Sequence, residues 1–305
     1  MRTNFLDNSK IKKQYLKFIR SQETTKDTFR QKIKQLDTIY IPLSDLIFKK
    51  FHKRKNTQII GLSGSQGSGK STISKILKII LKEKYKLNVT IISIDDFYKT
   101  LEERKKMSKK ISDLFFTRGV PGTHDTRLLY NSLKKLKRKN FRPFSIPKFD
   151  KSKDNRCDKN HWLKIKKKPD IIIFEGWCVG AKSQPKNSLI NPINELERKQ
   201  DKYLIWRKKV NLELKGEYKK IFDLINLLIF LKIPSFKYVY MWRALQEKKL
   251  RTSSKGNKIM NNIQIKRFIM FYERITRDML KTLPMKSKVL ISIDESHCLH
   301  SMKVN

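Results

Sequence analysis

The stretch GLSGSQGSGKST, residues 61–72, constrains the fold of this chain more than any other. It contains the pattern G-x-x-x-x-G-K-S and stands between an apolar run, 58–63, and a stretch whose apolar residues recur at helical spacing. Glycines at these positions let backbone N–H groups converge on phosphate oxygens, and the N-terminus of a following helix also favours anions. The stretch therefore predicts a strand, a phosphate-binding loop (P-loop) and a helix in succession.

The polar side chains of this loop have separate predicted tasks. Lys70 is expected to reach the β- and γ-phosphates of a nucleotide triphosphate, and the Ser71 hydroxyl is expected to ligate Mg²⁺. A chance occurrence of the pattern is the alternative, and the strand and helix expected on either side count against it. The predicted nucleotide-binding residues are Gly64, Ser65, Gln66, Gly67, Ser68, Gly69, Lys70, Ser71 and Thr72.

Apolar runs recur along the chain and alternate with amphipathic stretches. Each run is nearly continuously apolar, as strands that are covered on both faces must be. This alternation indicates an α/β fold with a mostly parallel β-sheet flanked by helices. The expected strands are 58–63, 88–94, 170–176, 224–233 and 289–294.

The chain divides into two segments of different texture. Residues 1–56 mix charged and apolar residues at helical spacing and predict an N-terminal helical extension, whereas residues 57–305 carry the α/β pattern of the main domain. Two polar segments in that domain, at about 97–168 and 177–221, are too long for simple connections. We expect them to form substrate loops.

The chain is strongly basic, with 71 Lys and Arg against 28 Asp and Glu in 305 residues and a formal net charge of +43. Such a field attracts polyanions. The lysines are nevertheless scattered through almost every segment, without the interleaved aromatic residues with which proteins stack bases. Compositional bias at the surface is therefore favoured over a nucleic-acid partner.

The sequence shows no signal peptide, no membrane-spanning run and no cysteine pattern of a disulfide or zinc site. The first residues lack the apolar core of a signal peptide, and the run 225–233 is far short of the ~20 residues that cross a bilayer. Three cysteines, Cys157, Cys178 and Cys298, form no C-x-x-C pair and indicate neither a disulfide framework nor a zinc site. We expect a soluble, cytoplasmic protein without a membrane partner.

Carboxylates stand at two of the predicted strand ends. Asp95 and Asp96 follow the run 88–94, at the edge where ligands bind in open α/β sheets. Asp95 is expected to accept the proton of an attacking hydroxyl; Asp96 is a substrate contact or, alternatively, the N-cap of the next helix. Glu175, which ends the run 170–176, is expected to act with Ser71 at Mg²⁺.

Several motifs together give the chain a family resemblance. They are GLSGSQGSGKST, SIDDFYKT, TRGVPGTHDTRLL, IPKFDKSKDNR and IIIFEGW, in this order. The chain from about Thr57 to Asp294 resembles the D-glycerate 3-kinase family, a branch of the phosphoribulokinase, uridine kinase and pantothenate kinase group of P-loop kinases. It departs from that pattern at Phe149, where a Tyr is usual, and around Gly256, which is richer in Lys and Asn.

The resemblance implies ATP- and Mg²⁺-dependent phosphorylation of D-glycerate to 3-phosphoglycerate, with Asp95 at the position of the base. A small hydroxy acid needs cations for its carboxylate and acceptors for its hydroxyls. Arg118, His124, Lys151 and Arg156 are the candidate cations. His124 taken alone fits a loop or capping residue better, and its neighbours in the expected substrate loop favour a functional role. Further candidate substrate contacts are Asp96, Tyr98, Asp125 and Asp150.

The segment YVYMWRALQEKKLR, 238–251, resembles the part of these kinases that precedes the lid. Arg243, Lys248 and Arg251 lie there at helical intervals and are the candidate lid cations, unless they form a solvated helix face. Two alternatives stay open at this point. One is a nucleoside or pantothenate kinase, and the other is a nucleotide-binding ATPase with a basic surface that engages nucleic acid.

Overall fold

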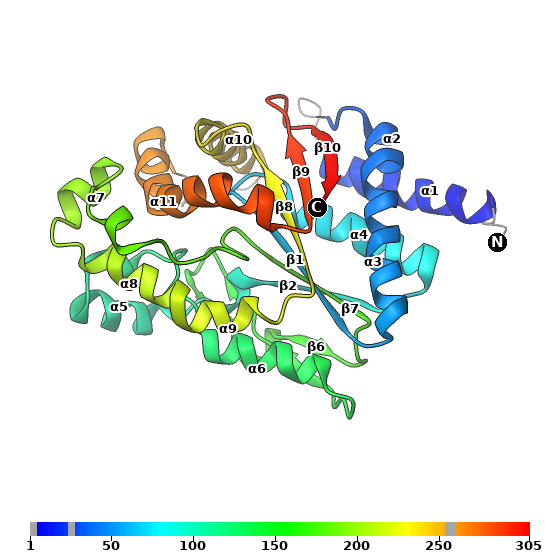
Figure 1. Cartoon of the computed structure of the whole chain (residues 1–305), viewed down its shortest axis with the longest axis horizontal. Coiled ribbons are helices and arrows are strands. Elements are labelled where there is room, and N and C mark those ends of the chain that lie inside the picture. Colours follow the sequence, from blue (N-terminus) through cyan, green and yellow to red (C-terminus); the bar gives the residue numbers. More distant parts are fainter. Residues whose placement is uncertain (1–4, 24–27, 254–259) are drawn as a thin grey trace.

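A six-stranded sheet forms the centre of the protein in a computed structural model that describes residues 5–23, 28–253 and 260–305 (Figure 1). The strand order is β10-β9-β8-β1-β7-β2, and all neighbours are parallel except β9 and β10. The strands are β1 Gln58–Gly64, β2 Val89–Ser93, β7 Ile171–Gly176, β8 Leu227–Lys232, β9 Val289–Ile293 and β10 Leu299–Val304. The five strands expected from the sequence are confirmed, with ends shifted by up to three residues. The antiparallel β10 was not expected.

The register of the parallel strands brings distant loops to one edge of the sheet. Gln58 of β1 is paired with Ile171 of β7, and Val89 of β2 is paired with the same Ile171. Because the three strands start level, their carboxyl ends finish at the same edge. The P-loop, the residues after β2 and the end of β7 therefore meet there.

Helices cover both faces of the sheet (Figure 1). On one side lie α1 Phe5–Gln22, α2 Lys32–Gln35, α3 Ile41–Arg54 and α4 Lys70–Tyr85. Towards the other lie α5 Leu101–Lys110, α6 Thr126–Lys137, α7 Glu195–Gln200, α8 Ile205–Glu213 and α9 Lys219–Phe222. Two further helices, α10 Lys237–Ser253 and α11 Asn262–Lys286, connect β8 to β9. None of the helices in the described part of the chain has the length and apolar character of a membrane span.

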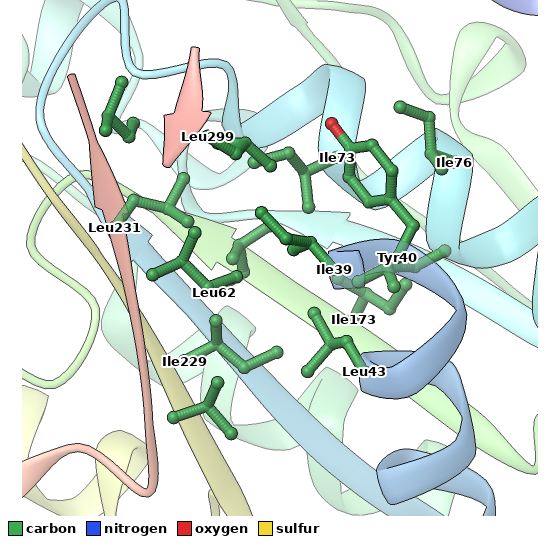
Figure 2. Packing of buried hydrophobic residues seen from close by; sticks show 14 of the residues in the cluster. Ile39, Tyr40, Leu43, Leu62, Ile73, Ile76, Ile173, Ile229, Leu231 and Leu299 are labelled. Atoms are coloured by element: carbon green, nitrogen blue, oxygen red, sulfur yellow. The ribbon is translucent and has the colours of Figure 1, made fainter. Parts of the chain in front are cut away.

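The N-terminal extension is helical, as expected, and packs directly on the sheet layer. Ile19 of α1 and Leu43 of α3 are both fully buried. Figure 2 shows Ile39, Tyr40 and Leu43 facing apolar side chains of β1, β7, β8 and α4. The predicted segments 1–56 and 57–305 thus contribute to one hydrophobic core.

The two long polar segments contain structure of their own. The first includes α5, α6 and two small antiparallel sheets, which pair β3 Phe144–Ile146 with β6 Leu163–Ile165 and β4 Phe149–Asp150 with β5 Asn155–Arg156. The second forms α7, α8 and most of α9. The first supplies Tyr98, Arg118 and Lys151 to a cavity at the carboxyl edge of the sheet, whereas Trp177 lines it from the second.

Candidate active site

The P-loop leaves β1 and enters α4 through two glycines in the left-handed region of backbone conformation. Gly67 has φ 79° and Gly69 has φ 83°. A Cβ atom on Gly67 would also lie 2.8 Å from Cβ of Trp242 in α10. Only glycine fits both the backbone and the space at residue 67, which explains why the sequence places glycine there.

Lys70 lies across this loop. Its Nζ donates to the carbonyl oxygen of Ser65 at 2.8 Å. Burial lowers the pKa of the Lys70 ammonium, while the carboxylates of Glu175 and Asp95 oppose that shift. The hydroxyls of Ser65 and Ser68 are buried and have no hydrogen-bond partner among the described residues. Buried polar atoms without partners are costly, so the loop is suited to an anion that would bind them.

Glu175 joins the end of β7 to the first turns of α4. Its Oε1 accepts a hydrogen bond from Ser71 Oγ at 2.8 Å, and its Oε2 accepts one from Ser74 Oγ at 3.0 Å. Hydroxyl and carboxylate oxygens are the ligands that Mg²⁺ prefers, usually with phosphate oxygens and water completing the shell. Within the described residues no cluster of three His, Cys, Asp or Glu side chains could hold a metal unaided. Ser71 and Glu175 therefore fit a Mg²⁺ ion that arrives with a phosphate ligand.

Asp95 follows β2 in a 3₁₀ turn, Ile94–Phe97, and receives two hydrogen bonds. Tyr98 donates its phenol proton to Oδ1 at 2.9 Å, and Lys151 Nζ donates to Oδ2 at 2.8 Å. Burial by itself would raise the pKa of this carboxyl, but the charge and hydrogen bond of Lys151, with smaller contributions from His124 and Tyr98, lower it to about 2. Asp95 is thus ionised at any physiological pH.

Asp96 has a different environment. It accepts from Lys148 Nζ at 2.8 Å and from the Phe149 amide at 3.4 Å, which ties the turn after β2 to the start of β4. The N-cap alternative for Asp96 was wrong, because Thr100 caps α5 in a capping box with Glu103.

A cavity of about 250 Å³ lies between the P-loop, the turn after β2 and α11. We call it the first cavity. Ten of its wall residues were expected from the sequence, and they come from six segments of the chain: Gln66, Gly67, Lys70, Ser71, Asp95, Tyr98, Arg118, Lys151, Glu175 and Arg243. Sequence reasoning missed Ser93, Gly176, Trp177, Phe268 and Tyr272. Phe268 and Tyr272 lie four residues apart on α11, a spacing that also fits ordinary core residues, so no sequence signal set them apart.

The candidate cations of the substrate loop separate into two groups. Arg118 and Lys151 line the first cavity, where Arg118 forms an ion pair with Asp154 and lies over the ring of Phe149. Arg156 is not part of that wall. It binds the carboxylate of Asp125 at 3.2 Å and donates to the Tyr98 carbonyl at 3.0 Å.

His124 is fully buried behind Tyr98, with the two rings stacked at 4.4 Å between centroids. Its Nδ1 lies 2.6 Å from the hydroxyl of Tyr218. Burial lowers the pKa of the imidazole to about 3, so the ring is neutral. A neutral ring cannot serve as the cation for a substrate carboxylate, and the geometry does not support that expectation.

Three expected carboxylate contacts are occupied by the chain itself. Asp125 caps α6 by accepting from the Leu128 amide at 3.0 Å. Asp150 accepts from the amides of Ser152 and Lys153 within its own turn. Like Asp96, neither lines the first cavity. Asp96, Asp125 and Asp150 are therefore not part of the proposed acceptor site.

The candidate lid cations differ in placement along α10. Arg243 lines the first cavity, forms an ion pair with the buried Glu247 and lies over the ring of Phe268. Lys248 is exposed. The side chain of Arg251 and the sequence around Gly256 lie outside the described residues. Of the two whose side chains the structure describes, Arg243 is the one positioned to meet a ligand in the cavity.

Comparison with known proteins finds one matching family model and several similar kinases. The profile of the Phosphoribulokinase / Uridine kinase family matches residues 59–188. An uncharacterized kinase of Schizosaccharomyces pombe is 34% identical over 224 residues, which cover 70% of this chain and 78% of that protein. The chloroplastic D-glycerate 3-kinase of Arabidopsis thaliana is 29% identical over 233 residues, covering 74% of this chain but only 48% of that protein.

A solved structure agrees in fold. D-glycerate 3-kinase from Cryptococcus neoformans superposes with a TM-score of 0.73 and 23% identity, over 88% of this chain and 99% of the other. At that identity the likeness speaks for the fold alone.

Proposed function

This chain belongs to the phosphoribulokinase / uridine kinase family, and we propose that it uses ATP and Mg²⁺ to convert D-glycerate to 3-phosphoglycerate. Membership makes it a kinase that transfers a phosphoryl group to a hydroxyl acceptor. The identity of the acceptor and the use of ATP with Mg²⁺ are our proposal, which the family and the chloroplastic D-glycerate 3-kinase among its relatives support.

One observation carries the proposal: a single small cavity holds the P-loop lysine, an ionised carboxylate and further cations. Lys70 and Asp95 both line the roughly 250 Å³ of the first cavity, together with Arg118, Lys151 and Arg243. A three-carbon hydroxy acid fits beside a γ-phosphate in such a volume more readily than a nucleoside or pantothenate does. Its carboxylate also finds a cation there.

In the proposed reaction, an acceptor hydroxyl hydrogen-bonds to Asp95 and attacks the γ-phosphorus. The new O–P bond forms as the bond to ADP breaks, and the hydroxyl proton passes to Asp95. A pKa of about 2 makes Asp95 a weak base. It suits phosphoryl transfer, in which orientation of the nucleophile matters more than early proton removal.

The surrounding residues hold charge in place during this step. Lys70 neutralises the β- and γ-phosphates, and Arg243 approaches from α10. Mg²⁺, when bound by Ser71 and Glu175, supplies further neutralisation of phosphate charge. Arg118 has five donors, so it can keep Asp154 and still bind an acceptor carboxylate.

A coupled assay for ADP release tests the proposal directly. The purified protein is given ATP and Mg²⁺ with D-glycerate, uridine, pantothenate or ribulose 5-phosphate as separate acceptors. We expect D-glycerate to give the highest kcat/KM. Preference for uridine or pantothenate would transfer the assignment to those kinase types, and ATP turnover stimulated by nucleic acid without any acceptor would favour the ATPase alternative.

A further inference from the structure

Asp154 does not line the first cavity, but its carboxylate binds two arginines, only one of which lies on the cavity wall. Its Oδ1 accepts from Nη1 of Arg118, which lines the cavity. Its Oδ2 forms an ion pair with Nη2 of Arg104 at 3.0 Å, and Arg104 is not part of the wall. The carboxylate therefore links a guanidinium that can meet a ligand to one that cannot.

Arg104 is the fixed end of this chain of contacts. Its side chain, on α5, is fully buried. The guanidinium donates to the carbonyl oxygens of Phe116 at 2.6 Å, Asp154 at 2.7 Å and Lys99 at 3.3 Å. A buried cation is costly unless a counter-charge lies beside it, and Asp154 is the carboxylate that forms an ion pair with Arg104. Burial and hydrogen bonding together thus hold this carboxylate in place.

The turn between β4 and β5 also fixes Asp154 through its backbone. Asp150 is paired with Asn155, so residues 151–154 form the turn. Asp154 has φ 55°, in the left-handed region that Asp and Asn adopt more readily than most other side chains. Oδ1 of Asn155 accepts from the Leu101 amide at 3.1 Å, which ties the turn to the start of α5. The position of Asp154 is therefore set by contacts that do not involve Arg118.

Arg118 is restrained by an aromatic ring as well as by Asp154. Its Cζ lies 5.5 Å from the ring centre of Phe149. A long side chain loses rotamer freedom when it binds a ligand, and restraint before binding lowers that cost. Asp154 occupies Nη1, which leaves further guanidinium donors for a carboxylate in the cavity. The contacts of Arg118 thus prepare it for a ligand without using up its donors.

We propose that Asp154 is a positioning residue of the acceptor site: held by Arg104, it orients the Arg118 guanidinium towards the carboxylate of the acceptor. The inference rests on the proposed function and adds to it a residue outside the cavity wall. If Asp154 instead competed with the acceptor for Arg118, its removal would tighten acceptor binding. The direction of the change in acceptor binding therefore separates positioning from competition.

Steady-state kinetics of Asp154→Asn measures that direction. Asn has a similar size and tolerates the left-handed backbone, but it carries no charge. We expect KM for D-glycerate to rise about three- to tenfold, with kcat and KM for ATP little changed, because the acceptor itself must then order Arg118. Asp158→Asn is the matched control and should keep wild-type values, since Asp158 is exposed and does not line the first cavity. An unchanged or lower KM for D-glycerate in Asp154→Asn overturns the proposal.

A double-mutant cycle shows whether the effect passes through Arg118. In the Arg118→Ala background, Asp154→Asn should cause no further fall in kcat/KM for D-glycerate, because the side chain that Asp154 positions is gone. A further fall of the same size would show that Asp154 acts by another route and would refute the positioning role. Melting curves check that each variant is folded at the assay temperature, because Asp154→Asn leaves Arg104 buried without its counter-charge. If that variant does not fold, Arg104→Gln/Asp154→Asn, which removes both charges, replaces it in the cycle.

A chemical readout needs no acceptor. Phenylglyoxal modifies guanidinium groups, and peptide mass spectrometry gives its rate at Arg118 relative to that at the exposed Arg142. We expect Asp154→Asn to raise this ratio severalfold, because Arg118 is released from its ion pair. An equal ratio in wild type and variant would contradict the proposed role. Failure of the wild-type protein to phosphorylate D-glycerate would count against the proposed function, whereas the modification rates would still test whether Asp154 holds Arg118.

Discussion

Two adjacent carboxylates, Asp95 and Asp96, point into different surroundings, and their contacts decide what each can do. Asp95 faces the first cavity and is held by Tyr98 and Lys151. Asp96 turns towards Lys148 and the chain before β4. The sequence assigned the role of base to Asp95, and of the two carboxylates Asp95 is the one that lines the cavity.

Replacing Asp95 with Asn should lower kcat about 10²-fold or more, because the amide cannot take the hydroxyl proton. ATP affinity should survive, since the triphosphate is held by the P-loop. Asp96→Asn is the matched control and should be milder. Steady-state kinetics of both variants decide the matter, and the opposite ranking would mean that the wrong carboxylate has been assigned.

The arginines of the substrate loop are separated in the same way. Arg118 lines the first cavity, whereas Arg156 lies behind it on Asp125 and the Tyr98 carbonyl. A guanidinium can bind a carboxylate through two parallel hydrogen bonds. Arg118 is therefore the better candidate to hold the carboxylate of the acceptor.

We expect Arg118→Ala to reduce kcat/KM for D-glycerate by 10- to 1000-fold, equivalent to roughly 1.4 to 4 kcal/mol, with little change in KM for ATP. Arg156→Ala should act mainly on stability, through the lost pair with Asp125, which a melting curve would register. Normal D-glycerate kinetics in Arg118→Ala would place the acceptor carboxylate elsewhere.

At the scale of elements, the second long polar segment, 177–221, packs against the first, 97–168, and holds it in place. The Tyr218 hydroxyl, just before α9, accepts from the Gly122 amide at 3.0 Å and lies 2.6 Å from Nδ1 of His124. His124 in turn stacks on Tyr98, which donates to Asp95. A helical layer remote from the P-loop thus positions the segment that holds Asp95.

Burial of the His124 imidazole makes the free energy of unfolding depend on pH. The pKa of His124 falls from 6.5 to about 3 on folding, so between these values the unfolded chain binds a proton that the folded chain does not. Above pH 6.5 both states carry a neutral His124 and the residue costs no stability. As the pH falls from 6.5 towards 3, protonation of the unfolded chain progressively lowers the free energy of unfolding. Moving from pH 7.5 to pH 5 should therefore cost on the order of 2 kcal/mol from this residue.

Urea unfolding at both pH values measures this cost. His124→Gln should reduce the difference in unfolding free energy between pH 7.5 and pH 5, even if the variant is less stable at each pH. The exposed His52 provides the control, because His52→Gln should keep the wild-type difference. An unchanged difference in His124→Gln would show that other groups carry the acid sensitivity.

For the whole molecule, the net charge of +43 is the feature without a role in the proposed reaction. A groove lined by Lys135, Arg138, Lys139 and Arg142 at the end of α6 illustrates how basic the surface is away from the first cavity. Non-specific attraction of polyanions follows from such charge.

If the net positive charge reflects compositional bias at the surface and not a nucleic-acid partner, D-glycerate phosphorylation should proceed without nucleic acid. Binding to DNA or RNA should lose most of its affinity, by 10³-fold or more, between about 50 and 200 mM salt and show no sequence preference. Fluorescence anisotropy over a salt series with two unrelated sequences measures both properties. Tight, sequence-selective binding at physiological salt would instead make nucleic acid a partner.

The sequence alone predicted the five parallel strands, the helical extension, the P-loop and the carboxylates at the strand ends. These features depend on local spacing and on one general fact, that parallel strands end at a common edge. Gly67, Asp95 and Glu175 could therefore be placed at that edge without knowing any side-chain contact.

Only the tertiary structure decided which loop residues face the cavity, because that depends on partners far away in the sequence. His124 is buried and neutral through packing that includes Tyr218, 94 residues further on. Arg118 and Arg156 look equivalent in sequence, yet Asp154 and Asp125 hold them in different places. Local spacing fixes the backbone of a loop, whereas side-chain pairing across the fold fixes where its charges point.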